Sequence, residues 1–273
     1  MLYLWRIRTM SYPNTHIHPD ATIGKGVTID PFTVIHNDVE IGDGTWIGSN
    51  VTVFPGARIG KNCKVFPGSV ISAIPQDLKF EGEITTAEIG DNTTIREFVT
   101  INRGTKALGK TVVGTGNLLM AYVHVAHDCV IGNNCILANG ATLAGHIIID
   151  DFAIIGGLSA IHQFVHVGSH VMVSGGSLIK KDVPPFIKAA REPLAYMGLN
   201  SVGLKRRGFS QDKIVVIQDI YRIIFQKGYN SSQALQVIEA EITPSAVRDE
   251  IVAFVKSSTR GILKGYSSNG SEE

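Results

Sequence analysis

Every sixth residue is aliphatic across most of the first two thirds of the chain. The series begins at Ile17 and runs to Ile179. An α-helix would repeat its buried residues about every 3.6 positions and a simple strand every two, so neither element generates a period of six. Such a period predicts a solenoid in which each repeat contributes one short strand and one turn. The positions that break the series are Asp77, Glu83 and Ala107.

A second inward position accompanies each aliphatic one. Two residues earlier stands a small or β-branched residue, such as Val39, Thr45 or Ser69. Alternate residues of a strand share one face, so both positions are expected to point into the coil. Glycine often follows the aliphatic residue, as at Gly42 and Gly60. We expect these glycines and nearby asparagines to form corners with positive φ; the asparagines are Asn50, Asn62, Asn92 and Asn134.

This pattern resembles that of the hexapeptide-repeat proteins over about residues 15–183. The resemblance implies a mainly β fold, a left-handed parallel β-helix with three flat faces, which the pattern described below extends with a small α-helical C-terminal domain. The left hand comes from the family alone, because the general rule for parallel crossovers favours the right hand. Residues 74–86 and 104–111 lack the repeat and carry charges at core positions. They are predicted to be loops that project from the coil and form a binding edge.

The period changes after Asp182. The Pro184–Pro185 pair is expected to close the coil, because proline cannot donate to a strand ladder. Ser210 is a predicted N-cap for a helix through Lys227, and Asn230 with a glutamine three residues later predicts a second helix. Thr243–Pro244 is expected to open a third helix that ends near residue 261.

The remaining segments are short. Residues 1–14 are expected to be an N-terminal extension, with either Met1 or Met10 as the true start. Residues 184–265 form the predicted helical domain, and the polar residues 266–273 are expected to be a flexible tail.

Composition and charge exclude several classes of protein. The 273 residues carry 25 lysines and arginines against 24 acidic residues, so the chain has no overall charge that would attract it to nucleic acid. No apolar run approaches the ~18 residues of a membrane helix, and the first ten residues are too short for a signal peptide. We therefore expect a cytoplasmic protein without stable membrane insertion. The cysteines all occupy the small inward position, which predicts buried core thiols rather than disulfides; they are Cys63, Cys129 and Cys135.

The repeat converts sequence into geometry. One turn of a three-faced coil takes eighteen residues, so residues i and i+18 stack about 4.8 Å apart. His127 therefore stacks beneath Gly145, and Asp128 stacks beneath His146. This places a histidine, a carboxylate, a second histidine and a glycine backbone on one outer patch, with His124 and His162 in the same coils.

Acyl transfer to a hydroxyl requires such a set. Imidazole can take the hydroxyl proton, a carboxylate can fix its tautomer, and a glycine N–H can bind the developing oxyanion. No serine or cysteine is placed as a nucleophile beside His127, because Cys129 points inward. The pattern favours direct attack by the substrate hydroxyl, without an acyl-enzyme. A purely structural ladder of polar residues is an equally good interpretation of the stacking alone.

A metal site is the weaker interpretation of the remaining histidines. Three residues separate His162 from His166, and His170 follows. Some hexapeptide proteins are zinc lyases with interface histidines, but this spacing does not match theirs. We predict no metal.

Longer runs carry a closer resemblance. The runs IPQDLKFEGE, IREFVTINRGT, HVAHDCVIGNNCILANGATLAGH, DDFAIIGGLSAIHQF and GLNSVGLKRRGF resemble the UDP-N-acetylglucosamine O-acyltransferases of lipid A biosynthesis. The resemblance covers essentially the whole chain. It implies transfer of an (R)-3-hydroxyacyl group from acyl carrier protein to the 3-hydroxyl of UDP-N-acetylglucosamine. It also implies a homotrimer with sites between subunits, and no cofactor beyond the carrier's phosphopantetheine thioester.

The resemblance assigns roles to individual residues. His127 matches the general base, Asp128 the acid that orients it, and Gly145 the donor of the oxyanion N–H. The residues that match the sugar and catalytic pocket are Asp77, Lys79, His124 and His146. Those that match nucleotide or phosphopantetheine contacts are Gln76, His162, Gln163, Asn200, Arg206 and Arg207. Gly175, with Met172 beside it, matches the position that limits acyl-chain length, and a glycine there implies chains of about fourteen carbons or more.

Some residues depart from the family pattern and leave alternatives open. Glu192 and Pro193 stand where other members carry polar side chains, and Val202 stands where an acidic residue is expected. A 3-amino variant of the acceptor sugar therefore remains an alternative. So do another hexapeptide acyltransferase with a different donor or acceptor, and a non-catalytic solenoid scaffold.

Overall fold

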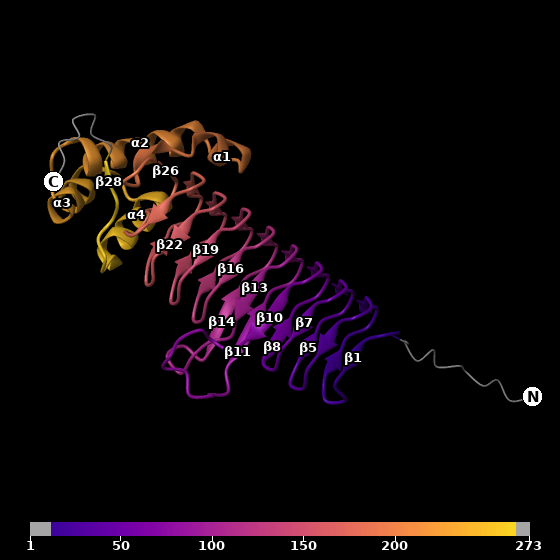
Figure 1. Cartoon of the computed structure of the whole chain (residues 1–273). Helices are drawn as coiled ribbons and strands as arrows, with labels where there is room; N and C mark the ends of the chain where they lie inside the picture. Colours follow the sequence, from indigo (N-terminus) through magenta and orange to yellow (C-terminus); the bar gives the residue numbers. More distant parts are fainter. Residues whose placement is uncertain (1–11, 266–273) are drawn as a thin grey trace, which may run out of the picture.

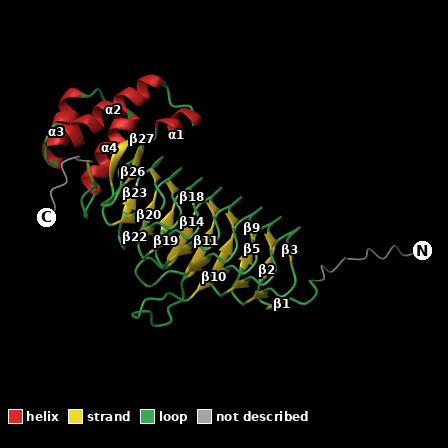
Figure 2. Cartoon of the chain, turned by 45° about the horizontal axis from the view of Figure 1, so that its top comes forward, coloured by secondary structure: helices red, strands yellow, loops and turns green. Residues whose placement is uncertain are grey.

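The computed structural model of the chain describes residues 12–265 and shows a long coil of short strands with helices packed at one end (Figure 1). The strands form three parallel sheets along the coil, as the six-residue period predicts (Figure 2). The β-helix followed by a helical region is therefore confirmed. No described helix is long and apolar enough to cross a membrane.

Up to β25, successive strands go to the three sheets in turn, so each sheet takes every third strand, and β26–β28 then all join the third sheet. The first sheet contains β1 (His16–Ile17), β4 (Val34–Ile35), β7 (Thr52–Val53), β10 (Val70–Ala73), β13 (Thr100–Asn102), β16 (His124–Val125), β19 (Thr142–Leu143), β22 (Ala160–Ile161) and β25 (Leu178–Ile179). The second contains β2 (Thr22–Ile23), β5 (Glu40–Ile41), β8 (Ala57–Ile59), β11 (Thr86–Ile89), β14 (Lys110–Val113), β17 (Val130–Ile131), β20 (Ile148–Ile149) and β23 (His166–Val167). The third contains β3 (Thr28–Ile29), β6 (Trp46–Ile47), β9 (Lys64–Val65), β12 (Thr94–Ile95), β15 (Leu118–Leu119), β18 (Ile136–Leu137), β21 (Ile154–Ile155), β24 (Met172–Val173), β26 (Ile187–Ala190), β27 (Ala195–Leu199) and β28 (Lys264–Gly265).

Strand pairing explains why the six-residue period continues in phase after each of the two loops. His16 pairs with Val34, eighteen residues later, which is one full coil. Val70 pairs with Thr100, thirty residues later, so the loop after β10 adds twelve residues to one coil. Thr100 pairs with His124, so the loop after β13 adds six. Both insertions are whole multiples of six, and the broken positions of the series fall within them.

The loop boundaries differ slightly from the predicted ones. The first loop occupies residues 74–85, because Thr86 already pairs in β11. The second occupies residues 103–109, because Lys110 and Thr111 pair in β14. Both loops project from the coil near its middle (Figure 1).

The aliphatic positions and their small partners fill the interior of the coil. Ile35, Ile47 and Val53 are fully buried, and so are the small inward residues Val51 and Thr45. Cys63, Cys129 and Cys135 are buried as predicted. Burial raises the pKa of the Cys129 and Cys135 thiols to about 12, which suits small core side chains.

The structure explains the glycines after the aliphatic positions differently from the prediction. The four asparagines do adopt positive φ, between 53° and 58°. The glycines do not, and instead lie against the next coil. A Cβ on Gly42 would be 2.6 Å from the carbonyl carbon of Gly60, and a Cβ on Gly156 would be 2.3 Å from the N of Gly175. Close stacking of coils, rather than backbone conformation, requires glycine there.

The C-terminal region extends the third sheet before it becomes helical. The predicted closure at Pro184–Pro185 is wrong, because β26 continues in parallel register with β24 and β27 then pairs antiparallel with β26. The prolines fall in the turn before β26, where no ladder hydrogen bond is needed. Tyr221 is fully buried and donates a 2.6 Å hydrogen bond to the carbonyl of Pro185, which ties the helices to this turn.

Four helices follow: α1 (Ser201–Arg206), α2 (Gln211–Gln226), α3 (Ser231–Glu241) and α4 (Ala246–Ser257). The N-cap at Ser210 and the capping box of Asn230 with Gln233 are confirmed. The third predicted helix corresponds to α4, which begins two residues after the predicted start, because Ser245 rather than Thr243 accepts a hydrogen bond from the first turn. It ends at Ser257, before the predicted end near residue 261. The short helix α1 was missed, since Gly203 lowers helix propensity within it.

The predicted N-terminal extension lies partly outside the described residues, as does the predicted tail at 266–273. Residues 12–14 do not form a free extension. The Tyr12 hydroxyl donates to the carbonyl of Val27 at 3.0 Å, and Thr15 donates to the carbonyl of Tyr12. The first coil is therefore capped by this turn.

Candidate active site

An open groove of about 750 Å³ lies on the outer face of the first sheet, across β16, β19 and β22. The loop at residues 74–85 forms one wall of the groove. The predicted site residues that line it are Gln76, Asp77, Lys79, His124, His127, Gly145 and Gln163. Segments distant in the sequence thus meet at one surface, because the coil stacks them.

His127 and Asp128 form a buried pair at the edge of this groove. The Nδ1 atom of His127 lies 2.8 Å from Oδ2 of Asp128, and the side chains are 9% and 0% exposed. Asp128 occupies a corner with φ of 58°, a left-handed conformation that aspartate tolerates. A carboxylate only accepts hydrogen bonds, so Nδ1 carries a proton, and in the neutral imidazole Nε2 then has a free lone pair.

The loop at residues 103–109 supplies further donors to Asp128. The backbone N–H groups of Thr105 and Leu108 donate to Oδ1 at 3.0 and 3.2 Å, and the Thr105 hydroxyl donates to Oδ2 at 2.7 Å. Burial opposes ionisation of the carboxyl, but the hydrogen bonds from His127 and Thr105 outweigh it and lower the pKa of Asp128. The carboxylate is therefore held ionised. Sequence reasoning missed Thr105, because a loop outside the repeat has no stacking register to place it.

Gly145 lies directly over the His127 ring. A Cβ on this glycine would be 2.6 Å from both Cε1 and Nε2 of the imidazole, so no other residue fits without displacing the ring. Among the described residues, none accepts a hydrogen bond from the Gly145 N–H. The groove therefore presents a basic nitrogen and an unused donor side by side, the pair that acyl transfer needs.

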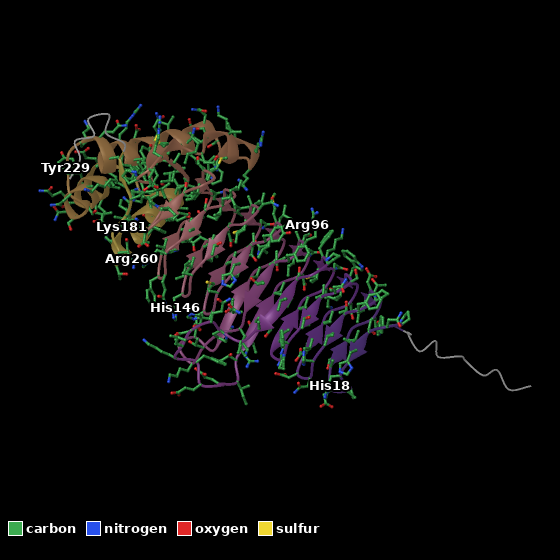
Figure 3. All side chains as sticks on the ribbon, in the orientation of Figure 1. His18, Arg96, His146, Lys181, Tyr229 and Arg260 are labelled. Carbon is green, nitrogen blue, oxygen red and sulfur yellow. The ribbon has the colours of Figure 1, made fainter. Side chains whose placement is uncertain are left out.

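Two more histidines flank the pair. His146 stacks on Phe164 with ring centroids 4.8 Å apart. The Nε2 atom of His146 lies 3.7 Å from Oδ2 of Asp128, which is longer than a hydrogen bond. Figure 3 shows His146 on the side of the coil from which the loops project.

The Nδ1 atom of His124 lies 2.7 Å from the Thr100 hydroxyl. Burial, with the nearby His127, lowers the pKa of His124. The ring of His124 is therefore neutral near neutral pH.

The ligand atoms of His127, Asp128 and His146 lie within 4.8 Å of one another, a spacing that a metal ion could bridge. The donors of the loop already satisfy the Asp128 carboxylate, which leaves little reason for a cation there. Two of the histidines considered as metal ligands in the sequence have other partners. Nε2 of His166 lies 2.9 Å from Oδ2 of Asp150, and the ring of His170 stacks on Phe152.

His162 lies at the groove, directly after β22 and between the lining residues Ile161 and Gln163, and its Nδ1 is 3.1 Å from the carbonyl of Gln163. The remaining predicted site residues lie on other edges of the coil. Gly175 lies between the third and first sheets, beside Met172 of β24. The other three lie near the edge between the second and third sheets, where Phe152 turns from β20 into β21; they are Asn200, Arg206 and Arg207.

Asn200 has a structural role within this chain. It is buried, caps α1 by accepting from Gly203, and donates to the carbonyl of His170 at 2.9 Å. Arg206 is exposed at the end of α1, and the guanidinium of Arg207 lies 5.0 Å over the ring of Phe152. Within one chain, none of the three lines the groove that contains His127.

Comparison with known proteins matches both parts of the chain. A family model described as "Udp N-acetylglucosamine O-acyltransferase; Domain 2" matches residues 182–263, and the bacterial transferase hexapeptide model matches residues 38–73 and 110–145. An acyl-[acyl-carrier-protein]–UDP-N-acetylglucosamine O-acyltransferase of Thiobacillus denitrificans is 46% identical over 93% of this chain and 98% of its own. The chain belongs to the UDP-N-acetylglucosamine O-acyltransferase family.

Other members of the O-acyltransferase family match the chain at similar identity. A relative from Verminephrobacter eiseniae is 48% identical over 71% of this chain and 76% of its own. The crystal structure of a UDP-N-acetylglucosamine acyltransferase from Bacteroides fragilis superposes with a TM-score of 0.92 at 54% identity, covering 93% of this chain and all of that one. The predicted family resemblance is thereby confirmed.

A methyl group at position 145 tests the packing over His127. Gly145→Ala would push the imidazole out of line, and a displacement of about 1 Å costs on the order of 100-fold in rate. We expect kcat to fall by about that factor while the melting temperature stays close to that of the wild type. Wild-type kcat in a folded Gly145→Ala protein would show that the ring need not stay in place.

Proposed function

We propose that the chain is an acyl-[acyl-carrier-protein]–UDP-N-acetylglucosamine O-acyltransferase that works in the cytoplasm. It transfers an (R)-3-hydroxyacyl group from acyl carrier protein to the 3-hydroxyl of UDP-N-acetylglucosamine, the first step of lipid A biosynthesis. The observation that carries the proposal is the buried His127–Asp128 pair beside the unused N–H of Gly145, at the edge of an open groove.

The mechanism follows from the free lone pair on His127. Nε2 takes the proton of the sugar hydroxyl as the hydroxyl oxygen attacks the thioester carbonyl. The Gly145 N–H donates to the oxyanion of the tetrahedral intermediate, and Asp128 stabilises the imidazolium. The intermediate then expels the phosphopantetheine sulfur, which takes up the proton from His127.

Among the described residues, no serine or cysteine lines the groove. Cys129, the cysteine nearest in sequence to His127, is buried and donates to the carbonyl of Ala144 at 3.1 Å, and burial raises its pKa to about 12. The hydroxyl of Thr142, which lines the groove, donates to the carbonyl of Gly140. Direct attack by the acceptor is therefore the mechanism that these side chains support.

Transfer from a set of 3-hydroxyacyl carrier proteins to UDP-N-acetylglucosamine tests the function and the base together. We expect transfer by the wild type and a loss of ~10³-fold or more in His127→Ala, because general-base catalysis contributes about 10²–10⁴-fold. Transfer that survives in the variant would remove the mechanism and keep the activity. No transfer by the wild type, also with the 3-amino sugar as acceptor, would favour a scaffold.

We further propose a homotrimer with each active site between two subunits. In one chain the groove lies on the first sheet, whereas Arg206, Arg207 and Asn200 lie near the edge between the second and third sheets. Gly175 lies at the edge between the third and first sheets. These residues can meet at one substrate only if a second chain presents its own edge to the groove. Several large apolar side chains are exposed along one corner of the coil and suit such contacts; they are Phe32, Phe98, Tyr122 and Leu158.

Mixed trimers test this arrangement. The two variants, His127→Ala and Arg206→Ala/Arg207→Ala, are expected to be inactive separately. Random mixing leaves about one interface in four with both halves intact, so about a quarter of wild-type activity should return. The mass in sedimentation should equal three chains. A monomer, or no recovery in confirmed mixed oligomers, would contradict the shared site.

The acyl-chain length is proposed to depend on Gly175. The three atoms nearest to a Cβ there would all be backbone atoms of Gly157, with the carbonyl oxygen at 3.0 Å, so glycine leaves this surface without a side chain that a longer residue would add. Gly175→Met should shift preference toward shorter chains, because each excluded methylene forfeits ~0.8 kcal/mol. The ratio of kcat/KM for donors of different length measures the shift. Unchanged selectivity would refute the assignment.

A further inference from the structure

The turn at residues 103–109 is shaped to face Asp128. Gly109 donates its N–H to the carbonyl of Thr105 at 2.7 Å, and Ala107 donates to the Thr105 hydroxyl at 3.2 Å. A Cβ on Gly104 would lie 2.3 Å from the N of Lys110, so only glycine allows the chain to close this tightly. The turn therefore presents the N–H groups of residues 105 and 108 toward one point.

That point is the carboxylate of Asp128. Thr105 alone supplies two of its hydrogen bonds, from the backbone N–H to Oδ1 and from the hydroxyl to Oδ2. Thr105 is buried, with 7% of its surface exposed. Within residues 12–265, no other side-chain hydroxyl bonds to this carboxylate, since Thr111 bonds to the backbone N–H of Asp128 instead.

Two imidazoles compete for the same oxygen. Oδ2 of Asp128 lies 2.8 Å from Nδ1 of His127 and 3.7 Å from Nε2 of His146. A small rotation of the carboxylate would exchange one partner for the other. The hydrogen bonds from Thr105 hold both oxygens in place, which keeps the short bond on His127.

The turn itself is anchored away from the groove. Thr85 donates its hydroxyl to the carbonyl of Gly104 at 2.6 Å, and Lys106 donates its N–H to Glu83 at 3.2 Å. Because the loop at 74–85 holds the turn at two points, the turn can keep Asp128 in a fixed position.

We propose that Thr105 is a positioning residue for catalysis: its hydroxyl fixes the Asp128 carboxylate on Nδ1 of His127 and so keeps Nε2 free as the base. The proposal rests on the proposed role of His127. Thr105 does not line the groove, so its loss should lower kcat and leave the KM for UDP-N-acetylglucosamine unchanged.

The test compares Thr105→Val, which removes the hydroxyl and keeps the backbone N–H, with Thr105→Ser, which restores the hydroxyl. We expect kcat to fall about tenfold in Thr105→Val, with KM within about twofold, and to recover in Thr105→Ser. Thr93→Val is the matched control, because Thr93 is a buried threonine that bonds the carbonyl of Gly114 away from the groove. If valine prevents folding, Thr105→Ala removes the same hydroxyl without the added methyl.

A double-mutant cycle identifies the partner. If Thr105 acts through Asp128, adding Thr105→Val to Asp128→Asn should cause little further loss of kcat. Equal kcat in Thr105→Val and Thr93→Val, or losses that multiply in the double variant, would overturn the proposal.

A readout without turnover separates this proposal from the proposed function. In protein labelled with ¹⁵N-histidine, the Nδ1 proton of His127, assigned by its loss in His127→Ala, should be shifted or broadened in Thr105→Val and unchanged in Thr93→Val. An unchanged signal in Thr105→Val would contradict the positioning role, whether or not the protein transfers acyl groups. Absence of acyl transfer, together with the expected spectral change, would contradict only the proposed acyltransferase function.

Discussion

The in-register stacking of eighteen-residue coils is the constraint on which the other features depend. It places residue i against residue i+18, and it brings His127 under Gly145 with no room for a side chain between them. It also explains the glycines after the aliphatic positions, which allow one coil to approach the next. The same close approach that stabilises the coil leaves a backbone N–H above an imidazole with no acceptor among the described residues.

The stacking alone would give only a ladder of polar residues. The insertions convert it into a site, because the loop at 74–85 walls the groove and the loop at 103–109 holds Asp128. Their lengths of twelve and six extra residues keep every later strand in register. New chemistry is thereby added on the outside of the coil without disturbing its core.

The β-helix and the stacking of His127, Asp128 and Gly145 could be predicted because both follow from a period that is visible in one dimension. Thr105 and the strands β26–β28 could not be predicted, since they lie outside that period and depend on contacts between distant segments. The glycines were placed correctly and explained wrongly, because close approach and positive φ favour the same residue. The roles of Asn200 and Arg207 remain proposals, because a single chain does not bring them to the groove.

The central claim is that the acceptor hydroxyl attacks the donor directly, with His127 as base. Intact mass of the protein after incubation with 3-hydroxyacyl carrier protein alone, together with initial rates over both substrates, tests it most directly. The account predicts an unchanged mass and intersecting double-reciprocal lines. A protein heavier by one acyl group, with parallel lines, would show an acyl-enzyme and contradict it.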